Sequence, residues 1–217
     1  MKIINLSENN SILNRFIAEI RDQKIQKDSM RFRRNLERIG EIFAYEISKT
    51  LEYTATDVTT PLGIAQCNLP ENEIVVSTIL RAGLPLHAGI LNYFDRAQNA
   101  FVAAYRKYGK DNKFTIQFEY ASAPSLQDKL LIIADTMLAT GSSLVLAYQK
   151  LCESGEPKHT HLVCPIASEQ SLGYLSKHLP HKKVTLWVAA VDQELTYKSY
   201  IVPGLGDAGD LAYGDKL

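Results

Sequence analysis

The chain has 217 residues, enough for one sizeable hydrophobic core but too few for two large domains. Hydrophobic residues make up 46% of it and charged residues 22%, as in ordinary globular proteins. Lysine plus arginine equals aspartate plus glutamate, at 24 each, so the bulk charge gives no argument for binding nucleic acid or an anionic membrane.

The cysteines, and the lack of a predicted membrane span or signal peptide, indicate in which compartment the protein is found. The three cysteines, Cys67, Cys152 and Cys164, are odd in number and form no C-x-x-C pair, so we predict buried free thiols in a reducing environment. No apolar stretch approaches the roughly 20 residues of a membrane span. The N-terminus also lacks the apolar core of a signal peptide. We therefore expect a cytoplasmic protein.

Hydrophobic periodicity predicts helices that alternate with strands. Apolar residues at helical spacing predict a first helix over about 12–20 and a longer one over about 32–47. Apolar runs predict strands at 74–79, 100–105, 130–134, 162–166 and 184–191, with helices at 84–94, 143–153 and 169–178. This order predicts an α/β fold with a parallel sheet of about five strands, covered by helices on both faces.

Two segments do not fit this alternation. Ile116, Phe118 and Tyr120 alternate with polar residues, which predicts a half-exposed strand in an antiparallel arm outside the main sheet. The glycine-rich segment 203–210 near the C-terminus is expected to be irregular.

The segment 130–143 is the strongest candidate site. A buried strand ends at Asp135, a loop of small and hydroxyl residues follows, and a helix begins near Ser143. The start of a helix presents unpaired N–H groups to a phosphate, and the acid could hold sugar hydroxyls or a metal on the same ligand. The loop has neither the Rossmann nor the Walker A pattern. The alternative is that Thr140 and Ser142 merely cap the helix.

Three further segments lie where a ligand site would be expected. Arg81 and Gly83 follow a predicted strand, at the edge of a parallel sheet where ligands bind, and Arg106 follows the next one. An arginine there suits an anionic group, although it could also be a surface charge. The C-terminal glycines suggest direct contact of the main chain with a ligand; the alternative is a mobile tail.

Other polar groups give weaker signals. The basic cluster of Arg31, Arg33, Arg34 and Arg38 is interpreted first as a solvated helix face, with an effector phosphate site or a subunit contact as the alternative. The five histidines have no metal-ligand spacing, although His159 and His161 would share a strand face, so we expect no structural zinc. No G-x-S-x-G elbow supports serine catalysis.

Taken together, four segments in this order resemble the uracil phosphoribosyltransferase family, which has the type I phosphoribosyltransferase fold. They are ILRAGL (79–84), YR (105–106), DTMLATGSS (135–143) and YIVPGLGDAGD (200–210), and weaker similarity covers nearly the whole chain. Where the family has proline after the loop's acid and a second glycine in the loop, this chain has Thr136 and Ser142. Ser142 must therefore take a negative φ or be strained.

The resemblance implies transfer of the phosphoribosyl group of 5-phosphoribosyl-1-diphosphate (PRPP) to N1 of uracil, which gives UMP and diphosphate in pyrimidine salvage. It implies that Arg106, Asp135 and Asp207 are catalytic. It also implies a uracil site at Ile201, Gly206, Asp207 and Ala208. The PRPP site would comprise Arg81, Arg106, Asp135, Thr136, Met137, Leu138, Ala139, Thr140, Gly141, Ser142, Ser143 and Asp207.

The resemblance also implies a domain plan and partners. We expect a single phosphoribosyltransferase domain over 1–217. Its terminal segments, 1–60 and 193–217, would build a small hood, and its core, 61–192, would carry a protruding β-arm near 107–125. Mg²⁺ would be carried by PRPP rather than by a protein metal site, GTP is a candidate effector, and the chain would form a homodimer or a larger homo-oligomer. The alternatives are a PRPP-sensing or RNA-binding regulator on the same fold, or a phosphoribosyltransferase for another base.

Overall fold

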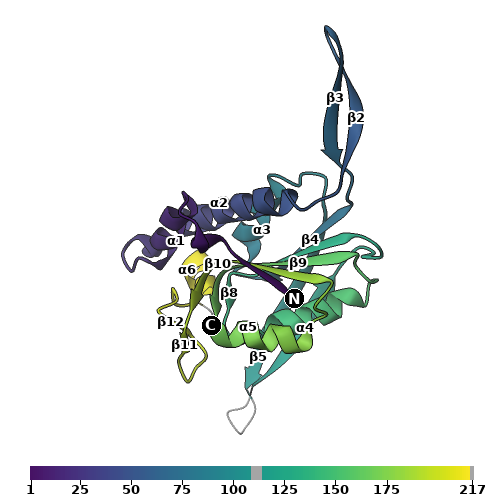
Figure 1. Cartoon of the computed structure of the whole chain (residues 1–217). Helices are drawn as coiled ribbons and strands as arrows, with labels where there is room; N and C mark the ends of the chain where they lie inside the picture. Colours follow the sequence, from purple (N-terminus) through teal and green to yellow (C-terminus); the bar gives the residue numbers. More distant parts are fainter. Residues whose placement is uncertain (109–113, 216–217) are drawn as a thin grey trace.

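A mostly parallel sheet forms the centre of the computed structural model, which describes residues 1–108 and 114–215, with the backbone alone for 104–108 and 114–119 (Figure 1). The eight-stranded sheet has the order β1-β10-β9-β7-β4-β5-β6, and β8 pairs with β9. Its strands are β1 (Lys2–Asn5), β4 (Ile74–Leu80), β5 (Gln98–Tyr108), β6 (Phe114–Ser122), β7 (Leu130–Ala134), β8 (Met137–Leu138), β9 (His159–Ser168) and β10 (Val184–Asp192).

The five central strands confirm the predicted sheet. Strands β10, β9, β7, β4 and β5 are the five predicted from apolar runs, and each pairs in parallel with its neighbour. The sequence did not predict β1, which adds a short parallel strand at one edge. Strand β6 pairs antiparallel with β5 as the predicted arm, but it belongs to the main sheet, as its edge strand, rather than lying outside it.

Helices cover both faces of the sheet, as the alternation predicted. The helices are α1 (Leu13–Arg21), α2 (Ser29–Ser48), α3 (Leu84–Leu91), α4 (Ser142–Cys152), α5 (Glu169–His178) and α6 (Ala208–Tyr213), with 3₁₀ turns at Leu6–Glu8 and Ile25–Lys27. Successive strand residues alternate between two cores. Val76 and Ile132 pack with α1, α2 and α3, whereas Val75 and Leu131 pack with α4 and α5.

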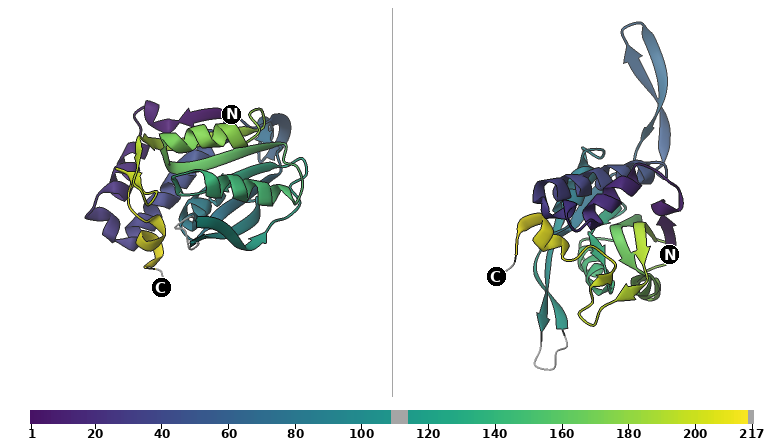
Figure 2. Two further views of the ribbon diagram at one scale, coloured as in Figure 1. Left: turned by 90° about the horizontal axis from the view of Figure 1, so that it is seen from below. Right: turned by 90° about the vertical axis from the view of Figure 1, so that its left-hand side faces the viewer.

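A second protruding hairpin was not predicted. Strands β2 (Tyr53–Thr60) and β3 (Gly63–Pro70) pair antiparallel and project from the end of the molecule opposite the β5–β6 arm (Figures 1 and 2). Every residue of β2 is exposed. Because almost all of its residues are exposed, its apolar alternation is short, limited to Ala65, Cys67 and Leu69 in β3. The hairpin spans the predicted boundary between residues 60 and 61.

The C-terminal segment is more regular than expected. Strand β12 (Ile201–Val202) pairs with β11 (Glu194–Leu195), and α6 begins inside the segment predicted to be irregular. The reason is local: the Asp207 carboxylate accepts hydrogen bonds from the backbone N–H groups of Gly209 and Asp210, at 2.9 and 3.1 Å. Aspartate is a favourable N-cap residue, which stabilises even this short helix.

The cysteines are free thiols, as predicted, but only Cys164 is buried; Cys67 and Cys152 are half-buried. Within the residues that the structure describes, no helix is both long and apolar enough to cross a lipid bilayer.

The basic cluster on α2 is largely occupied by contacts within the chain. Arg31 forms two hydrogen bonds with the buried Glu19 carboxylate, at 3.0 and 2.8 Å, and Arg34 pairs with Glu37 at 2.7 Å. Arg33 donates to the Ala212 carbonyl oxygen at 2.6 Å and lies against the Tyr213 ring. The cluster therefore ties α1 and α6 to α2, in addition to forming a charged face.

Glu19 predicts a pH dependence of stability. Hydrogen bonds from Arg31, and then from Asn35, lower the pKa of Glu19 from 4.5 to about 2. A carboxyl group with a lowered folded-state pKa stabilises the fold at pH above its unfolded-state pKa. We therefore expect the melting temperature to fall as the pH drops from about 4.5 to about 2.

Glu19→Gln should be less stable at neutral pH and should show a shallower decline, measured by thermal unfolding across this pH range. Glu8→Gln, at an exposed residue, is the matched control and should follow the native curve. Parallel curves for Glu19→Gln and the native chain would contradict this role of Glu19.

Candidate active site

Two of the predicted segments meet at the carboxyl edge of the sheet. Strands β4 and β7 are parallel neighbours, with Thr78 paired to Ala134, so the segments that follow them begin side by side. The Thr136 hydroxyl donates to the Ala82 carbonyl oxygen at 2.8 Å. This hydrogen bond joins the loop after Asp135 to the segment containing Arg81. Thr136 therefore has a structural role at the position where the family has proline.

The loop 135–141 leads directly into α4. One Asp135 carboxylate oxygen accepts a hydrogen bond from the backbone N–H of Thr136 at 2.8 Å. Gly141 takes the left-handed conformation, with φ +82°, and Ser142 is already the first residue of α4. Of the two alternatives for Ser142, the structure shows the unstrained one, because Gly141 supplies the positive φ and Ser142 is helical.

The structure does not favour the alternative that the Thr140 and Ser142 hydroxyls merely cap α4. The residue before α4 is Gly141, and no side chain caps the helix from this position. The Thr140 hydroxyl bonds the Ser142 hydroxyl at 2.8 Å and approaches its backbone N–H only at 3.4 Å. The start of an 11-residue helix thus faces the carboxyl edge with a small hydroxyl-rich loop, an arrangement that suits a phosphate group.

Strand β9 supports this loop from behind. The Ser168 hydroxyl donates to the Ala139 carbonyl oxygen and also caps the start of α5. Cys164 lies deep in β9, where burial, and then the nearby Asp135 charge, raise the pKa of its thiol. Both effects disfavour the thiolate, which is the nucleophilic form of cysteine.

Arg81 connects the sheet edge to the C-terminal segment. Its Nη2 donates to an Asp210 carboxylate oxygen at 3.3 Å and to the Gly214 carbonyl oxygen at 3.1 Å. The side chain is 38% exposed although its Nε is buried, so only part of the side chain is accessible to a ligand. The Leu80–Arg81 peptide bond is cis.

The C-terminal segment presents backbone rather than side chains. Ile201 and Ala208 are 4% exposed and pack into the core, whereas Gly206 is exposed and has φ +95°. Asp207 is half-buried and caps α6. The predicted uracil residues thus lie on one continuous segment, held near Arg81 by the Arg81–Asp210 contact.

The other predicted residues have different surroundings. Met137 and Leu138 form the short strand β8, and Leu138 is buried in the core. Ser143 lies in the first turn of α4. Arg106 lies in β5, opposite Ile116 of β6, but its side chain is outside the described part of the structure, as are residues 109–113 of the predicted arm.

Residues far from these motifs also hold the site, and the sequence did not reveal them. Arg21 at the end of α1 and Asp192 at the end of β10 bind the backbone of Gly204. Arg33 of α2 binds the end of α6. Arg21 and Arg33 are 183 and 179 residues from the carbonyl oxygens that they bind, so no local pattern links them, whereas Asp192 is 12 residues from Gly204.

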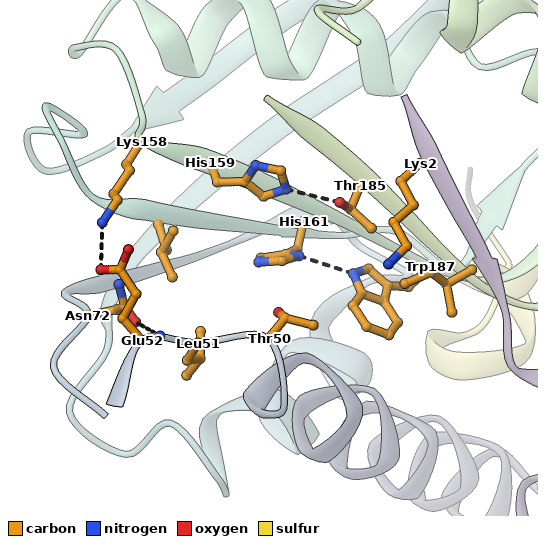
Figure 3. Close-up of a pocket in the computed structure, with 12 residues that line it drawn as sticks. Lys2, Thr50, Leu51, Glu52, Asn72, Lys158, His159, His161, Thr185 and Trp187 are labelled. Carbon is orange, nitrogen blue, oxygen red and sulfur yellow. Dashed lines mark hydrogen bonds and ion pairs between the residues drawn. The ribbon is translucent and has the colours of Figure 1, made fainter. Parts of the chain in front are cut away.

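The cavity drawn in Figure 3 lies elsewhere. It has a volume of about 370 Å³ and lies at the amino-terminal ends of the strands, where Lys2, Leu130 and His159 begin β1, β7 and β9. His159 and His161 share a strand face, as predicted, and His161 accepts a hydrogen bond from the Trp187 indole at 3.1 Å (Figure 3). Burial lowers the pKa of His161 to about 3. The cavity lined by these histidines is therefore at the opposite end of the strands from the candidate site.

Comparison with known proteins identifies the family. The uracil phosphoribosyltransferase family model matches residues 7–215. A uracil phosphoribosyltransferase of Porphyromonas gingivalis is 55% identical over 217 residues, all of both chains. One from Thermococcus gammatolerans is 35% identical over 97% of this chain and 92% of its own.

Solved structures agree with the fold. The AQ2163 protein of Aquifex aeolicus superposes with a TM-score of 0.87 and 30% identity, covering 98% of each chain. A hypoxanthine phosphoribosyltransferase of Staphylococcus aureus, at a TM-score of 0.51 and 12% identity over 90% of this chain and 92% of its own, shares the fold alone. The expected α/β phosphoribosyltransferase fold is thereby confirmed. The chain belongs to the uracil phosphoribosyltransferase family.

Proposed function

We propose that this chain transfers the phosphoribosyl group of PRPP to uracil, giving UMP and diphosphate. The observation that carries the proposal is the meeting of three segments at one edge of the sheet. Thr136 joins the phosphate-type loop to the Arg81 segment, and Arg81 joins that segment to α6 through Asp210. PRPP requires a loop that binds its sugar phosphate and a cation that binds its diphosphate. Uracil requires a segment whose backbone is accessible.

The reaction needs little covalent participation by the protein. The C1–O bond to diphosphate breaks, the C1–N1 bond to uracil forms, and the N1 proton is lost to solvent. We assign the ribose hydroxyls to Asp135, the 5-phosphate to the loop and first turn of α4, and the diphosphate to Arg81 and Arg106. Stabilisation of the leaving charge and positioning of the reactants are then the main catalytic devices.

Uracil recognition is assigned to the backbone near Gly206 and Ala208. The O2, N3–H and O4 groups of uracil form an acceptor–donor–acceptor edge, which fixed peptide groups can match. Cytosine would leave buried backbone groups unpaired, and this mismatch is costly. We place the Asp207 carboxylate between the base and the PRPP side of the site, where its negative charge stabilises the developing positive charge on the ribose.

The acids at the carboxyl edge fit a divalent ion that arrives with PRPP. In the part of the chain that the structure describes, no three His, Cys, Asp or Glu residues gather into a metal-binding group. Asp135 offers a carboxylate beside the proposed ribose position, an oxygen ligand of the kind that Mg²⁺ prefers. When bound to PRPP, Mg²⁺ offsets the charge of the diphosphate. GTP as an effector and a cytoplasmic location stay predictions.

We also propose that the chain forms a homodimer or a larger assembly. The β2–β3 hairpin supports this, because it protrudes while exposing Leu62 fully and Ile64 at 72%. An isolated two-stranded hairpin is at best marginally stable in water. We expect light scattering to give at least twice the chain mass of 24.3 kDa, and Ile64→Asp to lower it. A monomeric native chain would contradict this proposal.

A nucleobase panel tests the proposed substrate. Purified protein with Mg²⁺ and PRPP should convert uracil and leave cytosine, adenine, guanine and hypoxanthine unchanged, with and without GTP. Equal or faster conversion of another base would reassign the enzyme within its fold class.

Arg106 provides a test of the diphosphate site. Arg106→Ala should raise the KM for PRPP and lower turnover by on the order of tenfold to a hundredfold, because a cation facing the leaving group is lost. The β5–β6 pairing is made by the backbone, so the fold should persist. Arg96→Ala, exposed just before β5, is the matched control. Native kinetics for Arg106→Ala would remove this residue from the site.

A further inference from the structure

One ion pair binds both backbone groups of Gly204. The Asp192 carboxylate oxygen Oδ2 accepts a hydrogen bond from the Gly204 N–H at 2.9 Å. The Arg21 Nη1 donates to the Gly204 carbonyl oxygen at 3.0 Å. Arg21 and Asp192 also bind each other through two parallel bonds of 2.8 and 2.9 Å. The ends of α1 and β10 thus hold a single residue of the C-terminal segment.

This ion pair has a fixed geometry. The Asp192 side chain is 9% exposed and the Arg21 side chain 20%. A planar guanidinium that bonds both oxygens of one carboxylate fixes the relative orientation of the two groups. The pair therefore forms a rigid anchor. It differs from an exposed surface ion pair, which contributes little to stability because solvent screens it.

The anchored residue lies between the proposed uracil contacts, with Ile201 before it and Gly206, Asp207 and Ala208 after it. Leu205 is 4% exposed, and its carbonyl oxygen accepts a hydrogen bond of 2.8 Å from the Gln26 amide in the orientation that satisfies that side chain. At Gly204, with φ +55°, a Cβ would lie 2.2 Å from the Ile201 carbonyl oxygen, so the chain is tightly turned there. Gly206, which follows the buried Leu205, is exposed and has open space around it.

We propose that Arg21 and Asp192 are positioning residues for the base: they fix the backbone that recognises uracil without touching either substrate. The inference rests on the proposed uracil site at residues 201–208. Backbone groups recognise a base only when they are held in place, and misplacement by about 1 Å can cost a large factor in rate. Loss of the ion pair should therefore weaken uracil recognition while sparing the PRPP loop on β7 and α4.

The kinetic test uses Arg21→Gln, Asp192→Asn and the double variant. Each single variant leaves one charge of the ion pair without its partner, whereas the double variant removes both charges. Each should raise the KM for uracil about tenfold or more, with the KM for PRPP changed less than about twofold. Arg21→Lys keeps the charge but cannot bond both oxygens, so it should fall between the native chain and Arg21→Gln. Arg15→Gln, on the same helix with a side chain 70% exposed, is the matched control and should behave as native.

A second readout does not depend on activity. Amide hydrogen exchange over residues 201–209 should be faster in Arg21→Gln and Asp192→Asn than in the native chain or Arg15→Gln, while exchange in α4 stays unchanged. An unchanged KM for uracil in a folded variant, or a parallel rise of both KM values, would overturn the positioning role. If the native protein made no UMP, the proposed function would fail, and the exchange data would still decide whether this ion pair holds the segment.

Discussion

Replacing Asp207 by Asn is expected to lower kcat/KM for UMP formation by on the order of a hundredfold while leaving the fold intact. The Asp207 Oδ1 atom caps α6 through the N–H groups of Gly209 and Asp210. Asparagine is an equally good N-cap, so the substitution removes the negative charge and keeps the capping bonds. Steady-state kinetics and thermal unfolding, measured together, separate the two roles.

Two companion variants make this result interpretable. Asp207→Ala removes the cap as well as the charge, and should add a loss of about 1 kcal/mol in the free energy of unfolding. Asp28→Asn changes a second capping aspartate, which binds the Arg31 N–H at the start of α2, and should leave the kinetics unchanged. Native turnover in a folded Asp207→Asn would show that this charge does not act in the reaction.

The second large effect is expected at Gly141, where alanine should impair PRPP binding and the stability of the fold together. Alanine in the left-handed conformation costs roughly 1–2 kcal/mol. Its Cβ would also lie 2.7 Å from Cδ1 of the fully buried Leu175, so the loop or the Leu175 side chain must move. A shift at this position displaces the start of α4 from the phosphate. We expect the KM for PRPP to rise about tenfold or more.

Gly173→Ala is the matched control for this substitution. Gly173 lies inside α5, and a Cβ there meets nothing within 4 Å. Alanine should therefore stabilise α5 by roughly 0.5–1 kcal/mol and leave the KM for PRPP unchanged. A Gly141→Ala variant with the native KM for PRPP would contradict the assignment of this loop to the phosphate.

The elements that a single sequence can predict are those with a strong local pattern. The apolar stripe from Phe32 to Ile47 predicted α2, and the run from Leu130 to Ala134 predicted β7 to the residue. The hairpin β2–β3 has no buried face, and its period-2 pattern is limited to residues 65–69 of β3, too short to predict a pair of strands. Helix α6 was missed because glycine-rich segments suggest loops, and the capping by Asp207 outweighed that preference.

In the candidate site, too, some residues could be predicted from a local pattern and others could not. Its loop and Arg81 follow strands, as the rule that ligands bind at the carboxyl ends of parallel strands predicted, whereas Arg106, predicted to follow a strand, lies inside β5 because that strand continues into the pairing with β6. The anchors of the C-terminal segment, Arg21 and Asp192, come from the ends of α1 and β10, and only the folded chain brings them to Gly204. Thr136, an apparent departure from the family pattern, proved to link two loops through Ala82.

The most direct measurement of the central claim follows labelled uracil in the presence of purified native protein, Mg²⁺ and PRPP. Uracil phosphoribosyl transfer predicts UMP and diphosphate in equal amounts, with no product when PRPP is omitted. A folded protein that binds PRPP but forms no UMP from uracil would contradict the account.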